Sequence, residues 1–293
     1  MAWWFSQVLY HNGFVKAYNI VFVYFNTVMK GEQKLGDRVM KKYGIESLII
    51  EVTRRCNMNC AHCLRGDAQS ADLNIDVVNE LLKHIESVTF LTITGGEPTL
   101  NINGILDILE SFKSHHVDVY NLCIITNGKE NVDELLSALD KWHSYISGKS
   151  IYSEREISGH QIVSLLGSLE NVENACVSVA LSVDQFHDTI PEQNVIKLAM
   201  SPYFSKCKVH TREDLEWVIK EGRGEDICSC SSRIVDTGYS LYDECFSEIY
   251  LSCDGDITGD CDMSYETQEV SKLGNILDEP EILDRLAREY KEE

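Results

Sequence analysis

Residues 51–66 read EVTRRCNMNCAHCLRG and place Cys56, Cys60 and Cys63 in a C-x3-C-x2-C spacing. The apolar segment Ser47–Thr53, which has the composition of a β-strand, leads directly into this run. A cluster that is fully ligated by protein takes four cysteines, so three thiolates can hold a four-iron cluster and leave one iron open. The open iron indicates a site for a small molecule, and hence chemistry rather than electron storage.

The spacing alone also fits a zinc site with His62 or a distant cysteine as fourth ligand. Three further strand-like segments narrow the choice, because each ends in a short motif of polar residues or glycine. Phe90–Thr94 ends in Gly95-Gly96-Glu97-Pro98, Leu122–Thr126 in Asn127-Gly128, and Ala175–Val183 in Ser182-Val183-Asp184. In βα barrels the carboxyl ends of the strands meet at one mouth, where active sites lie.

In this order the four motifs resemble the radical S-adenosylmethionine (SAM) superfamily, over about residues 48–225. The resemblance implies that Cys56, Cys60 and Cys63 bind a [4Fe-4S] cluster whose open iron is chelated by SAM. Reductive cleavage of SAM would then yield a 5′-deoxyadenosyl radical that abstracts hydrogen from a substrate. The electron would come from a reductase such as flavodoxin or ferredoxin.

The same resemblance implies a set of residues around SAM: His62, Gly95, Gly96, Glu97, Asn127, Ser182 and Asp184. Glu97 would accept a charge-assisted hydrogen bond from the SAM ammonium, and the two glycines would let backbone approach the ligand. His62 stands where the superfamily commonly has an aromatic residue near the adenine. For the polar residues at strand ends, ordinary turn and cap roles fit nearly as well. No catalytic residue is assigned, and His187 and Asp188 of the FHD run receive no catalytic role.

A second group of cysteines follows residue 225: Cys228, Cys230, Cys245, Cys253 and Cys261. The run CFSEIYLSCDGDITGDC, the later Leu273-Gly274-Asn275-Ile276 and the earlier Gly222-Arg223 resemble the SPASM/twitch extension of radical SAM enzymes. That resemblance implies one auxiliary iron-sulfur cluster, which would leave at least one of the five thiols unused. A structural zinc site is satisfied equally well by four cysteines in a small loop-rich module.

The charge balance disfavours two classes of partner. The chain has 47 acidic against 26 basic residues, a net charge of −21, which opposes binding to nucleic-acid phosphates and to anionic membrane surfaces. Eleven cysteines in a long chain that shows no signal peptide at its start favour a reducing cytoplasm. Three isolated cysteines in or beside apolar runs are read as packing residues: Cys123, Cys176 and Cys207.

The first 46 residues do not match the barrel pattern. Apolar side chains recur there at helical spacing: Tyr18, Val21, Phe22, Phe25, Val28 and Met29. Polar residues interrupt the run, which makes it a poor membrane span. We expect a helix packed on the barrel or on a partner subunit. An interfacial membrane helix is the alternative, weakened by the scarcity of basic residues on its polar face.

From Ser47 onward strands alternate with helical runs at Ile75–Ser87, Gly104–His115 and Val132–His143. A further helix at Gly159–Leu169 and a strand near Lys206–His210 are also expected. The predicted fold is α/β: a partial (β/α) radical SAM barrel with an N-terminal helical extension and a small cysteine-rich C-terminal domain. The predicted domains are residues 1–46, 47–225 and 226–293.

The predicted function is a radical SAM oxidoreductase that acts on a peptide or protein residue. One alternative is a dehydrogenase or rearrangement enzyme for a small metabolite such as a carbohydrate or nucleoside. A second is a non-enzymatic metal or redox protein on a degenerate barrel.

Overall fold

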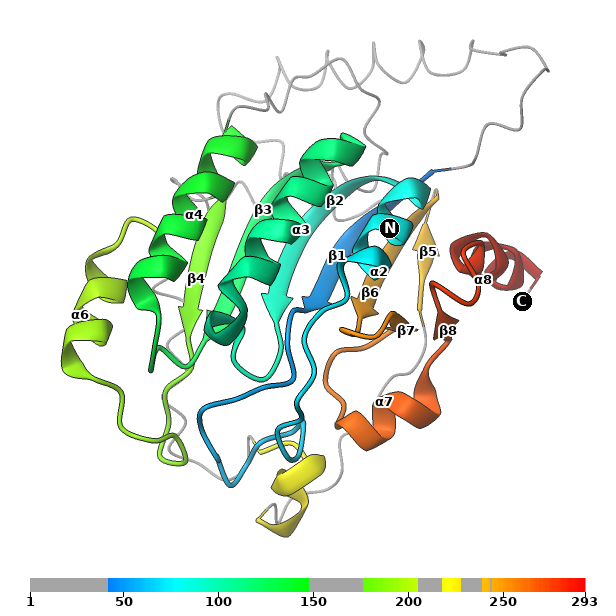
Figure 1. The fold of residues 1–293 in the computed structure, drawn as a ribbon. Coiled ribbons are helices and arrows are strands. Elements are labelled where there is room, and N and C mark those ends of the chain that lie inside the picture. Colours follow the sequence, from blue (N-terminus) through cyan, green and yellow to red (C-terminus); the bar gives the residue numbers. More distant parts are fainter. Residues whose placement is uncertain (1–41, 148–175, 205–217, 228–238, 243, 293) are drawn as a thin grey trace, which may run out of the picture. The chain divides into compact units, whose positions relative to one another are not determined.

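The computed structural model describes residues 42–147, 176–204, 218–227, 239–242 and 244–292, all within one compact unit. Four parallel strands lie in the order β4-β3-β2-β1: β1 (Tyr43–Glu51), β2 (Ile85–Thr94), β3 (Asp118–Thr126) and β4 (Val177–Leu181). Three helices cover one face of this sheet (Figure 1): α2 (Ile75–His84), α3 (Ile102–His115) and α4 (Val132–Ser147). A shorter helix, α6 (Glu192–Met200), follows β4. The alternation of parallel strands and helices confirms the predicted α/β class.

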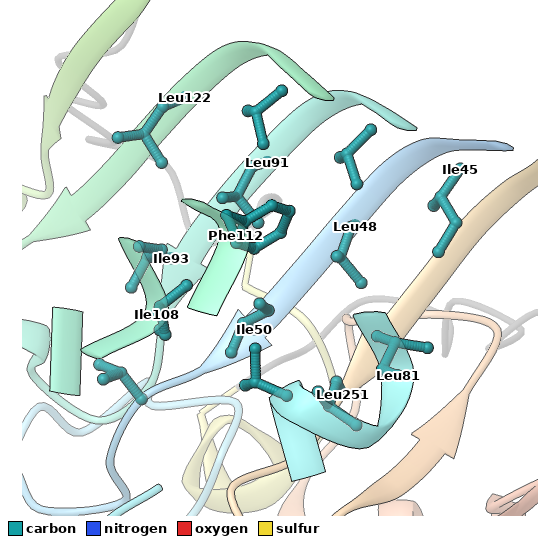
Figure 2. Close-up of a cluster of buried hydrophobic side chains, with 14 of the residues drawn as sticks. Ile45, Leu48, Ile50, Leu81, Leu91, Ile93, Ile108, Phe112, Leu122 and Leu251 are labelled. Atoms are coloured by element: carbon teal, nitrogen blue, oxygen red, sulfur yellow. The ribbon is translucent and has the colours of Figure 1, made fainter. Parts of the chain in front are cut away.

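The hydrophobic core lies between the sheet and its helices. Aliphatic side chains from neighbouring strands stand in register in two rows: Leu48, Leu91 and Leu122, then Ile50, Ile93 and Ile124. Leu81, Ile108 and Phe112 of the helices pack on these rows (Figure 2). Burial of each such side chain contributes about 1.5–3 kcal/mol, which explains why these segments read as apolar runs.

The opposite face of the sheet is more polar, because side chains alternate between faces along a strand. Ser47, Phe90 and Asn121 are paired in register there, and Thr92 is paired with Cys123 in a neighbouring row. Cys123 is 8% exposed, as expected of a packing residue.

The C-terminal residues extend the same sheet on the other side of β1. β6 (Cys245–Leu251) pairs in parallel with β1, and three short strands complete this side: β5 (Leu241–Tyr242), β7 (Asp256–Thr258) and β8 (Gly274–Asn275). Two helices follow in this region: α7 (Tyr265–Ser271) and α8 (Ile282–Glu292). The domain boundary after residue 225 stays a prediction, but residues on both sides of it contribute strands to one sheet.

Several elements begin or end away from their predicted positions. The helix predicted for Ile75–Ser87 ends at His84, because Ile85 is extended (φ −120°, ψ 153°) and begins β2. The predicted N-terminal helix, the helix at Gly159–Leu169 and the strand at Lys206–His210 lie outside the described residues. Among the helices that the structure describes, none combines the length and hydropathy needed to cross a membrane.

Candidate active site

The loop that leaves the carboxyl end of β1 carries Cys56, Cys60 and Cys63. The Cys63 amide donates to the Cys60 carbonyl at 3.1 Å, which closes a turn between the last two cysteines. All three residues are partly exposed, and all three border one small cavity of about 50 Å³. The C-x3-C-x2-C spacing therefore brings three thiols to one mouth of the sheet.

Gly95 and Gly96 follow β2 and line the same cavity. A Cβ on Gly95 (φ +152°) would lie 2.2 Å from the Thr53 carbonyl oxygen, and one on Gly96 would lie 2.3 Å from that of Arg55. The amides of Gly96 and Glu97 donate to these two oxygens, each at 2.7 Å. The glycines thus allow backbone to pack on backbone at the base of the cysteine loop. The close approach that they permit is to this loop, whereas the sequence suggested an approach to a ligand.

Glu97 is 1% exposed and caps the short 3-10 helix η2 (Pro98–Asn101). Its Oε1 accepts from the Thr99 amide (3.0 Å) and from the hydroxyls of Thr99 and Thr126 (both 2.7 Å), and its Oε2 accepts from the Asn127 amide (2.7 Å). Burial raises the pKa of Glu97, and the four hydrogen bonds offset part of that rise. The carboxylate joins the ends of β2 and β3, and its hydrogen bond to SAM stays a prediction.

Asn127 and Ser182 lie at the carboxyl ends of β3 and β4. Asn127 is 7% exposed, and its side-chain amide donates to Asn57 Oδ1 of the cysteine loop at 2.9 Å. The Ser182 amide donates to the Thr126 carbonyl at 2.9 Å. Asn127 therefore connects β3 to the cysteine loop, and contacts of either residue with a cofactor stay predictions.

His62 and Asp184, which the sequence treated as separate cofactor contacts, lie against each other. His62 Nε2 is 3.0 Å from Asp184 Oδ2, and His187 Nδ1 is 2.7 Å from Asp184 Oδ1. Burial opposes the charge of Asp184, but the Phe186 amide and the two imidazoles outweigh it and hold the pKa of Asp184 below its ordinary value.

Sequence reasoning did not assign the three arginines that line the cavity, Arg54, Arg65 and Arg223. The Arg54 guanidinium lies 4.7 Å from the ring centre of Tyr265, and that of Arg65 lies 4.9 Å from the ring centre of Tyr250. Arg54 and Arg65 flank the cysteines in the sequence itself, so their positions could have been found there. Tyr265 carries no comparable signal.

Gly222 and Arg223, noted in the sequence only as the entry to the tail, belong to the 3-10 helix η5 (Gly222–Asp226), which packs on the cysteine loop. The Arg223 amide donates to the Cys63 carbonyl at 3.0 Å, and its guanidinium donates to Asn59 and Asp67 of the same loop. A Cβ on Gly222 (φ +53°) would lie 2.5 Å from backbone atoms of that loop, so the turn requires glycine.

Residues 50–175 match the family model of the Radical SAM superfamily. This part of the chain is a radical SAM domain. An uncharacterized protein of Methanocaldococcus jannaschii is 30% identical over 108 residues, 33% of this chain and 36% of that protein. GTP 3′,8-cyclase of Clostridium perfringens is 30% identical over 96 residues, 30% of this chain and 29% of the cyclase. The chain thus matches about a third of the length of these curated relatives.

Among solved structures, BtrN in complex with AdoMet and 2-DOIA is 12% identical, with a TM-score of 0.46 over 85% of this chain and 87% of BtrN. For residues 50–175, the family match confirms the expected resemblance to the radical SAM superfamily.

The thiols of the radical SAM domain fit a four-iron cluster with one open iron. In the described part of the chain, no fourth cysteine lines their cavity. Burial raises the pKa of Cys60 to about 11, and the nearby Cys56 and Cys63 add to the rise. A raised pKa disfavours the thiolate, which is the form that binds iron. A coordinated metal overcomes this, because a thiol that binds a metal is deprotonated outright. His62, a possible fourth ligand of a zinc site, directs Nε2 to Asp184.

The three tail cysteines that the structure describes do not fit one shared cluster. Cys245 begins β6 and Cys253 follows its end. At about 3.3 Å per residue, the strand separates their positions by roughly 20 Å. Cys261 lies instead with Glu248 and Asp260, whose ligand atoms are all within 4.8 Å of one another. A cluster that uses both Cys245 and Cys253 is therefore incompatible with this strand, and Cys228 and Cys230 lie outside the described residues.

Proposed function

We propose that this protein cleaves SAM reductively at a [4Fe-4S] cluster held by Cys56, Cys60 and Cys63. The observation that supports this best is the meeting of three thiols at one cavity at the carboxyl end of β1, beside Gly95 and Gly96. When bound by these residues, the cluster and SAM would supply radical chemistry, the abstraction of hydrogen from a substrate. We also propose a reducing cytoplasm as the location, which suits such cluster thiolates, and a flavodoxin or ferredoxin as the electron donor.

The chain's own residues hold and shield this site. Gly95 and Gly96 fix the base of the cysteine loop, and Asn127 and Arg223 hold its two ends to β3 and to η5. The guanidinium groups around the cavity oppose the negative charge that three thiolates bring. Met58, which is 6% exposed and lines the cavity, excludes water from its wall.

The test is anaerobic reconstitution with iron and sulfide, followed by incubation with SAM and dithionite. Cys60→Ala is expected to abolish formation of 5′-deoxyadenosine, because two cysteines cannot hold the cluster. Cys176→Ala is the matched control: this half-buried thiol packs against the core and should leave product formation unchanged. Wild-type protein that is fully loaded with iron and yields no 5′-deoxyadenosine would refute the proposal.

For the substrate we propose a peptide or protein residue. The support is the tail spacing of Cys245, Gly255 and Cys261, which resembles the SPASM/twitch extension, and the FHD run at Phe186–Asp188, which resembles that of peptide-modifying members. The second candidate is a small metabolite such as a nucleoside or carbohydrate. The similarity to GTP 3′,8-cyclase, which by its name acts on a nucleotide, favours that alternative.

Extract of the source cells, split by size at about 1 kDa, separates the two candidates. A peptide or protein substrate should raise 5′-deoxyadenosine formation above the uncoupled rate in the large fraction, and protease treatment should remove the effect. Stimulation that stays in the small fraction and survives protease would reject the peptide and favour a metabolite. The Cys60→Ala variant supplies the background for both fractions.

A further inference from the structure

The carboxylate of Asp184 lies between two imidazoles just past the end of β4. Oδ2 is 3.0 Å from His62 Nε2, and Oδ1 is 2.7 Å from His187 Nδ1. The Phe186 amide donates to the same Oδ1 at 2.9 Å. The Asp184 side chain is 6% exposed, and groups of this chain contact both of its oxygens.

His62 is the residue before Cys63 and is held on more than one side. Its ring centre lies 4.8 Å from that of Phe186, with the planes tilted by 31°, and 5.3 Å from that of His187. One ring edge meets the carboxylate while one face meets an aromatic ring. The segment from Asp184 to His187 therefore fixes an imidazole of the cysteine loop from the neighbouring end of the sheet.

We propose that Asp184 is a positioning residue, which orients His62 and through it the cysteine loop and makes no contact with SAM. The inference rests on the proposed SAM site. The Asp184 side chain is 6% exposed, and its oxygens already meet the Phe186 amide and two imidazoles, so little of the carboxylate is open to a donor from SAM, and this disfavours direct binding. An imidazole fixed beside Cys63, in contrast, holds the cysteine loop in one conformation before SAM arrives, which lowers the ordering cost of binding.

A double-mutant cycle on the iron-loaded full chain tests this: His62→Phe, Asp184→Ala and the double variant. Phenylalanine keeps an aromatic ring but lacks the ring nitrogen that meets Asp184. Two quantities are measured, the SAM dissociation constant by equilibrium binding and the rate of iron release to a chelator without SAM. In the wild-type background, Asp184→Ala should raise the SAM dissociation constant and the rate of iron release by about tenfold each. This is the range for supporting residues around a metal site. In the His62→Phe background it should change each less than twofold.

Asp184→Asn should restore part of both quantities, because its amide oxygen still accepts from one imidazole. Asp133→Ala, an exposed carboxylate on α4 that pairs with Lys197, is the control and should change neither. An equal loss of SAM affinity in both backgrounds would mean direct contact with SAM and would overturn the inference. So would one zinc per chain that disappears in His187→Ala, since these three side chains would then form a metal site.

The cycle keeps this inference separate from the proposed function. A wild-type chain that holds iron but binds no SAM refutes the proposed function, while the iron-release cycle still measures the coupling of Asp184 to His62. If His62→Phe and Asp184→Ala have independent, additive effects on iron release in a chain that does cleave SAM, the positioning role alone is refuted.

Discussion

Replacement of Glu97 by alanine removes the acceptor of four hydrogen bonds from a site that is 1% exposed. The hydroxyls of Thr99 and Thr126 can rotate toward other acceptors, but the backbone amides of Thr99 and Asn127 cannot. Each stranded buried amide costs about 1–3 kcal/mol. The variant should therefore lose about 2–6 kcal/mol of unfolding free energy, a large share of the roughly 5–15 kcal/mol of an ordinary domain.

The assay is urea unfolding of the chain without iron and without SAM, followed by far-ultraviolet circular dichroism. Glu97→Gln keeps the size of the side chain and one oxygen, so it should lose about 1–3 kcal/mol, the cost of one stranded donor. Glu110→Ala is the matched control, because this glutamate is exposed on α3 and pairs with Lys113. It should change the unfolding free energy by no more than about 0.5 kcal/mol.

The result also separates the structural role of Glu97 from its predicted contact with SAM. If the carboxylate served chiefly to bind the SAM ammonium, Glu97→Ala would unfold like wild type. Only SAM binding would then weaken, by about 1.5–3 kcal/mol for one charged hydrogen bond. An unfolding loss below about 1 kcal/mol would refute the reasoning from burial.

Three further outcomes are expected. Gly96→Ala places a Cβ 2.3 Å from the Arg55 carbonyl oxygen; the cysteine loop should shift, and iron per chain after gel filtration should fall well below wild type. Cys245→Ala should leave iron unchanged by elemental analysis and cost about 1 kcal/mol of stability, whereas loss of half the iron would make Cys245 a ligand. Burial raises the pKa of Tyr203 to about 12, and its hydroxyl donates to Asp140 at 2.5 Å. The unfolded chain, with a tyrosine pKa of about 10, releases this proton at lower pH than the folded chain. The free energy of unfolding should therefore fall between about pH 10 and 12. Urea unfolding at pH 9 and at pH 11 should show a smaller fall for Tyr203→Phe than for wild type.

The alternation of strands and helices was predictable because the core-facing side chains are aliphatic and periodic. The first halves of β1 and β3 could not be predicted, because Tyr43–Glu46 and Asp118–Asn121 mix glycine or polar residues into the apolar pattern. Ile85 also continues the helical spacing of Leu81 and Leu82, which explains why the helix was predicted to run on to Ser87. The pairing of β6 with β1 joins Cys245 to Gly44, and no local pattern reports so distant a contact.

At the site, the positions of the functional residues could be predicted, but their partners could not. Residues at the carboxyl ends of parallel strands must converge, so Cys56, Glu97 and Asp184 were found from their place in the pattern. Whether a carboxylate faces a ligand or a neighbouring strand depends on packing, and Glu97 and Asp184 both meet protein donors. The tail shows the same limit. The sequence spacing of Cys245 and Cys253 does not give the distance between them until the residues between them are known to form a strand.

The tail and the cysteine loop form one structural unit through Glu51, the last residue of β1. Its carboxylate is fully buried and accepts from Tyr250 Oη at 2.5 Å, from Arg54 Nε at 2.6 Å and from the Cys253 amide at 3.3 Å. A buried carboxylate is tolerated only where a cation and hydrogen-bond donors compensate for lost hydration, and two of these three donors come from the tail. Arg54 in turn lines the cavity and lies over Tyr265 of α7. The described tail therefore supports the base of the cysteine loop by hydrogen bonds and packing.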